Sequence, residues 1–314
     1  MNPSITLSAF GNRLTASPLG ASLRQFALSR PDGSLFEPLW GYTDSAAKKG
    51  GQGDVLVPFP SRIKNGQYAF DGKTYQLELN DKEGPNAIHG FVRELAWDVT
   101  EQTPSAVTFF TQIDPTRVKR PGYPFALDVR VTYRLVSAGM ECQFAICNSG
   151  TEAAPIGTGF HPYFQVGTEG IDGAELELPA TRFLEFGPGL VPTGKLLSTA
   201  GTDLDFSVRK KIGPTRFNHC LTGIQVDPDG KARARLINPV NGTELEIWMD
   251  DVFKYWVVYS GEAIGQPYAR RFLAIEPMTC ATDAFNHESW GARRLEPGEV
   301  FRGKWGVQVK GLLT

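Results

Sequence analysis

The sequence predicts an all-β fold, built as one large antiparallel sandwich or closed barrel of many strands with very little helix. Three observations predict it. Polar and apolar residues alternate with a period of two over several segments, as in half-buried antiparallel strands. No segment keeps the 3.6-residue period of an amphipathic helix for more than about two turns. The 34 glycines and 22 prolines exceed the share of an average domain and mark frequent turns.

Five segments predict individual strands, in chain order. In residues 127–135 every odd position is apolar and every even position is polar. Residues 141–146 repeat this alternation after a short link that contains glycine, so the two segments are expected to form a hairpin. Residues 174–178 and 244–247 alternate in the same way. Residues 255–259 are aromatic or aliphatic throughout, which predicts a strand buried on both faces.

Length and charge limit the organisation and the partners. The 314 residues contain no proline- or serine-rich linker, fixed repeat or abrupt change of composition, so we expect a single domain over residues 1–314. The 32 Lys and Arg nearly balance the 34 Asp and Glu, and neither sign forms a long block. We therefore expect no nucleic-acid partner and no membrane partner, but a small neutral or weakly charged molecule. The expected assembly is a monomer or homodimer.

The compartment is predicted from the chain start and the cysteines. No apolar run approaches the length of about 18 residues that spans a bilayer, and the first residues lack the basic-then-apolar pattern of a secretory signal. We therefore expect a cytoplasmic protein. Cys142, Cys147, Cys220 and Cys280 show no CxxC spacing, and we expect all four to be reduced and buried.

Common catalytic motifs are absent from the chain. It contains no GxSxG, no GxxxxGK[ST] and no HExxH, and residues 157–159 lack the third glycine of a dinucleotide loop. What remains are polar residues in separate segments that could meet in a cleft. His161 stands in a glycine-cleared, aromatic segment, and Glu276 stands in an apolar one. Together they would form a complete acid/base couple, although a single histidine or glutamate at a strand end is usually structural.

Two further segments carry candidate binding residues. Arg62 follows a proline-bracketed entry and precedes the hairpin signal Asp71-Gly72, and its guanidinium could donate to sugar or carboxylate oxygens. His89 precedes a glycine that lets a backbone or a ligand come close. On these residues alone, a surface role for Arg62 and a structural role for His89 remain open.

Taken in order, these segments resemble the aldose 1-epimerase (mutarotase) family of the galactose mutarotase-like superfamily, over nearly the whole chain. Each of four segments is similar to a family pattern: residues 61–77 to N-R-I-x-x-G-x-F…G-x-x-Y-x-L, residues 86–90 to N-x-L-H-G, residues 159–164 to x-x-H-x-Y-F, and residues 275–286 to L-E-P/T…D-A-x-N. One such match is weak, but four in register are specific. The resemblance implies the large antiparallel β-sandwich, or supersandwich, of that superfamily.

The resemblance also implies a reaction. The family interconverts the α and β anomers of free aldoses through the open-chain aldehyde, with no metal or organic cofactor. Glu276 would be the base that takes the proton from O1, and His161 the acid that protonates the ring oxygen. Arg62, His89 and Asn218 would bind the sugar. The reference pKa of about 6.5 leaves a fraction of His161 protonated at neutral pH. Apolar neighbours should raise the pKa of Glu276 and Arg62 should lower it, so its net direction is open.

The chain departs from the family pattern at several sugar-binding positions. Ser61 stands where many members carry Asn, Phe91 replaces the second Gly of their H-G-G, Asn218 replaces an Asp, and Val257 stands where some carry Gln. We expect Phe91 to narrow the cleft wall and Asn218 to accept a weaker hydrogen bond than the Asp. None of these changes removes the acid or the base.

Two other functions are compatible with the residues. The first is a non-catalytic or regulatory carbohydrate-binding protein on the same scaffold, which would not need the acid/base couple. The second is a metal-dependent β-barrel enzyme with His89, His161, His219 and Glu276 as ligands. Those four residues lie far apart in the sequence, whereas such barrels usually draw two ligands from one strand.

Overall fold

A computed structural model describes residues 4–44 and 46–312. In this part of the chain the regular structure is antiparallel β-sheet without α-helix, which confirms the predicted all-β class. No helix among the described residues is long and apolar enough to cross a membrane. Helical backbone is confined to short 3-10 turns: η1 (Lys64–Gly66), η2 (Val92–Glu94), η3 (Ile171–Gly173), η4 (Pro188–Leu190), η5 (Glu262–Ile264) and η6 (Ala284–Asn286).

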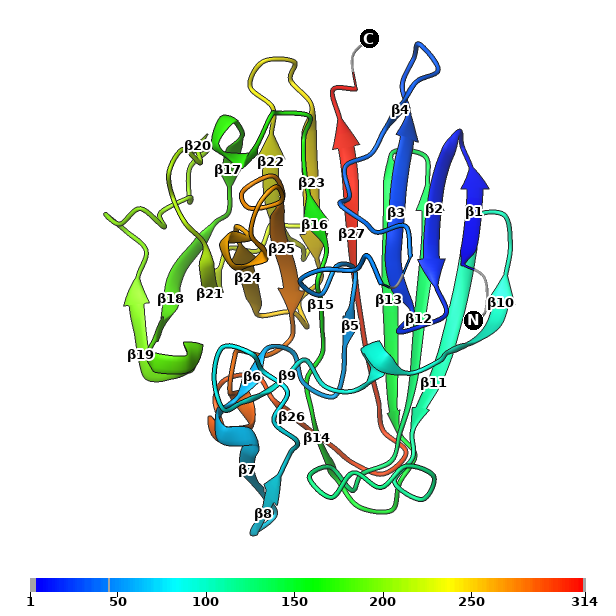
Figure 1. Cartoon of the computed structure of the whole chain (residues 1–314), viewed down its shortest axis with the longest axis vertical. Coiled ribbons are helices and arrows are strands. Elements are labelled where there is room, and N and C mark those ends of the chain that lie inside the picture. Colours follow the sequence, from blue (N-terminus) through cyan, green and yellow to red (C-terminus); the bar gives the residue numbers. More distant parts are fainter. Residues whose placement is uncertain (1–3, 45, 313–314) are drawn as a thin grey trace.

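A nine-stranded sheet forms the long layer of the molecule (Figure 1). Its longest strands carry the alternating pattern seen in the sequence, with the apolar side chains buried. The strands, in sheet order, are β10 (Asp98–Gln102), β11 (Ala106–Ile113), β12 (Leu127–Val136), β13 (Gly139–Asn148), β27 (Val300–Lys310), β23 (Glu244–Met249), β22 (Ala232–Ile237), β17 (Glu175–Glu177) and β20 (Lys210–Lys211).

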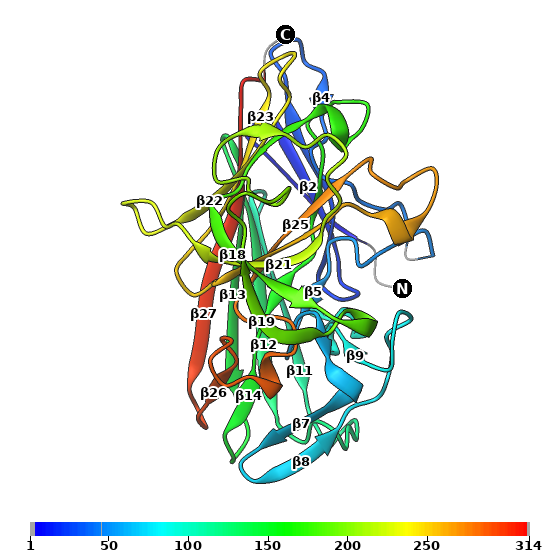
Figure 2. The same cartoon turned by 90° about the vertical axis from the view of Figure 1, so that its left-hand side faces the viewer.

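Two further sheets make up the second layer, and Figure 2 shows β27 and β13 on one side of the molecule with β25 and β2 on the other. The four-stranded sheet comprises β1 (Ile5–Ala9), β2 (Asn12–Ser17), β3 (Ser22–Ser29) and β4 (Leu35–Phe36), and it contacts β11 and β12. The eight-stranded sheet comprises β19 (Pro192–Ser198), β18 (Ala180–Phe186), β21 (Asn218–Ile224), β24 (Tyr255–Tyr259), β25 (Leu273–Met278), β15 (Gly159–Phe160) and β5 (Val55–Leu56), with β16 (Tyr163–Phe164) also on β25.

Three short two-stranded sheets complete the described structure. They are β6 (Arg62–Ile63) with β9 (Ala87–Ile88), β7 (Gln67–Phe70) with β8 (Lys73–Gln76), and β14 (Ala154–Ile156) with β26 (Arg293–Leu295). Both predicted hairpins are confirmed. Val136 pairs with Gly139 between β12 and β13, and Phe70 pairs with Lys73 around a two-residue turn. Positive φ angles at Asp71 (49°) and Gly72 (72°) give this turn the conformation that suits a two-residue hairpin.

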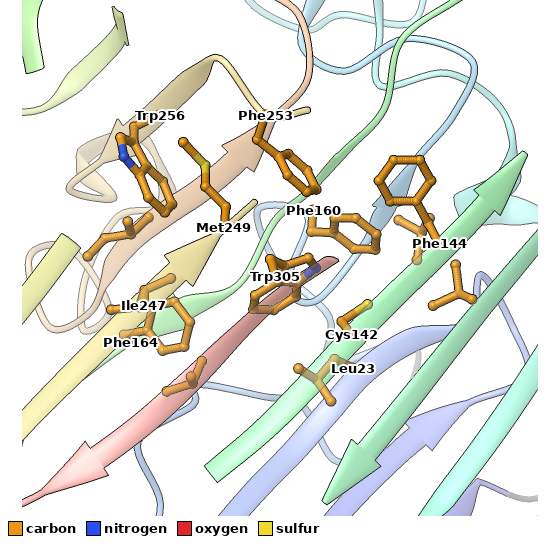
Figure 3. Close-up of a cluster of buried hydrophobic side chains, with 14 of the residues drawn as sticks. Leu23, Cys142, Phe144, Phe160, Phe164, Ile247, Met249, Phe253, Trp256 and Trp305 are labelled. Atoms are coloured by element: carbon orange, nitrogen blue, oxygen red, sulfur yellow. The ribbon is translucent and has the colours of Figure 1, made fainter. Parts of the chain in front are cut away.

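Aromatic side chains join the eight-stranded and nine-stranded sheets (Figure 3). Phe160, from β15, lies 5.4 Å from Trp305 of β27 and 6.3 Å from Phe144 of β13, measured between ring centroids. All three side chains are at most 1% exposed. Because successive residues of a strand point to opposite faces, this packing turns the neighbouring residue of the chain, His161, away from the core.

Two expectations need correction. Residues 255–259 do not form a strand buried on both faces: Trp256 and Val258 lie in the core, whereas Val257 and Tyr259 line a cleft on the other face. The strand is apolar on both sides because the cleft wall is apolar there. The cysteines are free, but Cys147 is half-buried rather than buried, because it lies on the outer face of β13.

Candidate active site

Strand register brings His161 to Glu276. Gly159 of β15 pairs with Met278 of β25, and Tyr163 of β16 pairs with Ala274 of the same strand. The same register, continued across the gap between β15 and β16, sets His161 opposite Glu276. Directly opposed residues of antiparallel strands lie on the same face with Cβ atoms about 5 Å apart. The histidine Nε2 is accordingly 3.6 Å from Glu276 Oε1, which is too long for a hydrogen bond.

This pair is buried and incompletely hydrogen-bonded. The side chains of His161 and Glu276 are 8% and 2% exposed. His161 Nδ1 and Glu276 Oε2 are buried without a hydrogen-bond partner among the described residues. Buried polar atoms of this kind are rare in folded proteins and mark a site that is completed by something else, such as a ligand or water. The pair therefore lacks the hydrogen-bonded contacts of a structural ion pair.

Burial sets the protonation of both groups. It raises the pKa of Glu276 well above the ordinary value of 4.5, and the opposing effect of Arg62 is smaller. The net shift of the Glu276 pKa, whose direction the sequence left open, is therefore upward. Burial lowers the pKa of His161 to about 3, with further lowering by Arg93 and Lys48. The expectation that a fraction of His161 is protonated at neutral pH is therefore wrong for the free protein, because a pKa of about 3 leaves the ring neutral.

Short strands β6 and β9 bring Arg62 and His89 to the same place. Arg62 pairs with Ile88 in the ladder, and the backbone N–H of His89 donates to the Ser61 carbonyl at 2.9 Å. The Ser61 N–H in turn donates to His89 Nδ1 at 3.1 Å. Burial lowers the pKa of His89 well below 6.5, so its ring is neutral. With Nδ1 as acceptor, the proton of the neutral ring must lie on Nε2, which makes Nε2 a hydrogen-bond donor.

Close backbone approach fixes the two histidines. Gly90 has a φ of 61°, and a Cβ atom there would lie 2.1 Å from the Val57 carbonyl oxygen. Gly51 has a φ of 77° and lies against the His161 ring, because a Cβ atom there would be 3.0 Å from Cδ2 of the imidazole. His161 also stacks on Tyr163 with a centroid separation of 5.0 Å. The imidazole of His161 is thus in contact with a loop and with an aromatic ring.

Arg62 is already engaged by two carboxylates. Its Nε donates to Asp81 Oδ2 at 2.8 Å, and its Nη2 lies 2.5 Å from Glu83 Oε2. The Asp81 carboxylate is buried and also accepts from Asn86 at 2.9 Å. These contacts orient the guanidinium and leave Nη1 as the donor that can reach a ligand.

All five predicted site residues line one cleft of about 550 Å³ on the outer face of the eight-stranded sheet. Asn218, at the start of β21, contributes its half-buried side chain. Phe91 does not line this cleft, so the expectation that it narrows the wall is wrong. Its ring packs instead against Phe59 and Tyr123, with the Arg120 guanidinium 4.6 Å above it.

The ligand set of the metal-dependent alternative is not assembled. His219 packs against Phe183 and accepts the Asn218 N–H, and it does not line the cleft with the other three residues. Over residues 4–44 and 46–312, no three His, Cys, Asp or Glu side chains are grouped as ligands of one metal ion. These side chains offer an acid/base pair and hydrogen-bond donors instead.

Comparison with known proteins identifies the family to which the chain belongs. Residues 3–308 match the sequence profile of the family described as aldose 1-epimerase. The chain belongs to the aldose 1-epimerase family. It is 34% identical over 236 residues to the uncharacterized protein YihR of Escherichia coli (strain K12), covering 74% of this chain and 71% of that protein. It is 26% identical over 285 residues to the galactose mutarotase of Bos taurus, covering 78% and 79% of the two chains.

A solved structure shares the fold of this family member. The GalM/aldose epimerase homologue from C. elegans superposes with a TM-score of 0.86 at 21% sequence identity, over 99% of this chain and 100% of the other. The predicted β-sandwich is thereby confirmed.

Several cleft residues of this aldose 1-epimerase family member were not predicted from its sequence. They include Asp81 and Glu83, which bind the Arg62 guanidinium, and Gly51, which lies against the His161 ring. They also include Arg93, which lines the cleft. A signal existed for Arg93, which follows His89 by four residues in the same segment. The others lie in loops whose course depends on the assembled sheets.

The pKa shifts give a direct prediction for the free protein at pH 5.5. Glu276 should be protonated, because its raised pKa keeps the proton where an ordinary glutamate is about 90% ionised. His161 should be neutral, because its pKa of about 3 is already exceeded. The infrared difference between wild type and Glu276→Gln should show a carboxylic-acid C=O band, and ¹⁵N NMR should show a neutral His161 ring. An ionised Glu276 or a charged His161 at this pH would contradict the assignment.

Proposed function

We propose that this chain, as a single domain, is an aldose 1-epimerase that interconverts the α and β anomers of a free aldose. The observation that carries the proposal is the buried, incompletely hydrogen-bonded pair of His161 and Glu276 in a cleft that also offers hydrogen-bond donors. Anomerisation needs one group to take the proton on O1 and one to protonate the ring oxygen while the C1–O5 bond breaks. A positioned acid/base pair can do both.

The residues have distinct roles in this proposal. Glu276 is the base at O1 and His161 is the acid at the ring oxygen. Ring opening by this route requires an ionised Glu276 and a protonated His161, whereas burial favours the neutral form of both groups in the free protein. The open-chain aldehyde rotates about C1–C2 and recloses with the roles exchanged. His89 Nε2 and Arg62 Nη1 donate hydrogen bonds to sugar oxygens, and Asn218 contacts a hydroxyl group.

An anomerisation assay over a panel of free aldoses tests the proposal. Polarimetry or NMR exchange would follow the purified protein with neutral, deoxy, acidic and sulfonated hexoses. Anionic sugars belong in the panel because Lys48, Lys49 and Lys82 also line the cleft. Acceleration of at least one aldose is expected. Binding of a sugar without any acceleration would overturn the proposal and favour the non-catalytic carbohydrate-binding protein.

A further inference from the structure

Arg93, in η2, lines the cleft without a hydrogen bond from its side chain to any described residue. Its Nε is buried and meets no acceptor. Nη1 lies 3.9 Å from Asp54 Oδ2 and Nη2 lies 3.8 Å from Glu94 Oε1, and both distances exceed a hydrogen bond. The side chain is only 19% exposed, so water satisfies its donors incompletely.

Other arginines of comparable exposure donate hydrogen bonds to two or more acceptors. Arg62 donates to Asp81 and Glu83, and Arg270 donates to Asp172, Glu262 and two backbone carbonyls. A planar guanidinium offers five donors in a fixed fork, which is well suited to oxygen acceptors. At Arg93 this fork is open toward the cleft.

The charge of Arg93 is also incompletely balanced. The Asp54 carboxylate, 3% exposed, is the buried carboxylate close to Arg93, but it is also bound by Lys48. One carboxylate thus faces two cations. Glu94 is 73% exposed, and water screens its attraction for Arg93. An excess of positive charge therefore remains at this end of the cleft.

Arg93 belongs to the His161 end of the cleft. Burial is the main cause of the low pKa of His161 and of His89, and the nearby charge of Arg93 lowers both further. Arg62, in contrast, acts on the pKa of His89 and Glu276. Asp54 connects Arg93 to His161 in space: its carboxylate lies 3.9 Å from Arg93 Nη1, and its backbone carbonyl accepts the His161 N–H at 3.0 Å.

We propose that Arg93 is a specificity-determining residue that binds an oxygen acceptor on the exocyclic carbon of the aldose, next to the ring oxygen. This inference rests on the proposed function. In an aldopyranose the ring oxygen joins C1 to C5. With Glu276 at O1 and His161 at the ring oxygen, C5 and its exocyclic C6 lie on the His161 side, where Arg93 stands. The acceptor is either a C6 hydroxyl or a C6 carboxylate.

The test compares a hexose, its 6-deoxy analogue and its hexuronate in three proteins: wild type, Arg93→Met and Arg93→Lys. Anomerisation is followed by NMR exchange, and Kd is measured by calorimetry in the Glu276→Gln background. Arg93→Met should raise KM and Kd for the hexose or the hexuronate by about 10- to 100-fold, with kcat little changed. For the 6-deoxy sugar the change should stay below about twofold. Arg120→Met, outside the cleft against Phe91, is the matched control and should leave all values unchanged.

The pattern of losses over the three sugars identifies the acceptor that Arg93 binds. A larger loss for the hexose identifies a hydroxyl acceptor, and a larger loss for the hexuronate, with recovery in Arg93→Lys, identifies a carboxylate. Equal losses for all three sugars, or no loss, would overturn the assignment of Arg93. Wild type that accelerates no aldose would overturn the proposed function instead, and the binding titration would still report on Arg93.

Discussion

Glu276→Gln should reduce kcat for anomerisation by about 10²- to 10⁴-fold, the usual contribution of one positioned proton-transfer group. Glutamine keeps the shape of the side chain but cannot take the proton from O1. Because Glu276 is buried on β25 without a charged partner in hydrogen-bond contact, the substitution should leave the fold intact. Polarimetry with the best aldose of the panel measures the effect, and the exposed Glu288→Gln is the control. Activity near the wild-type rate would exclude Glu276 as the base.

The same substitution should stabilise the free protein at neutral pH. Between pH 4.5 and the raised pKa of Glu276, the unfolded chain releases a proton that the folded chain retains. The folded state binds more protons there, so the free energy of unfolding of the wild type falls as pH rises. Glu276→Gln lacks this loss, and its Tm should exceed that of the wild type by more at pH 7 than at pH 4.5. A Tm difference that did not grow with pH would mean that Glu276 is ionised in the folded protein.

His161→Asn is the second substitution with a large expected effect. In the proposed mechanism it removes the group that protonates the ring oxygen, so the C1–O5 bond would have to break toward an unassisted oxyanion. We expect kcat to fall by about 10²- to 10⁴-fold, with KM less affected, since Arg62 and His89 still contact the sugar. NMR exchange between the anomers measures this.

The matched control for His161 is His219→Asn. His219 is also a histidine of the eight-stranded sheet, but it packs against Phe183 outside the cleft. Its replacement should keep the rate near that of the wild type. Equal losses in the two variants would show that the effect comes from damage to the sheet and not from loss of the acid.

The long strands could be predicted from the sequence because their pattern is local. In β12 and β13 one face packs on the core. Burial of that face therefore appears in the sequence as an alternation of apolar and polar residues over ten positions. The strands β15 and β16 could not be predicted in this way. They have two residues each and form only by pairing with strands distant in sequence, β15 with β25 and β5, and β16 with β25. The prediction that residues 255–259 are buried on both faces failed because Val257 is apolar but lines the cleft instead of the core.

The sequence identified the residues of the candidate site but not their arrangement in space. His161 and Glu276 stand more than a hundred residues apart in the sequence, and only the resemblance to a family connected them. Their protonation could not be read from sequence because it depends on how completely the fold excludes water. Arg93 was missed for a related reason, because an arginine without acceptors is recognised only after every neighbour is placed.

The position of β27 has a consequence for how the chain is made. This strand, formed by residues Val300–Lys310, lies between β13 and β23 and joins the two halves of the nine-stranded sheet. During translation it leaves the ribosome after all the strands it joins. Until then β13 and β23 have open edges with unpaired backbone groups, which can pair with other chains. A message that ended before Val300 would yield two half-sheets prone to aggregate.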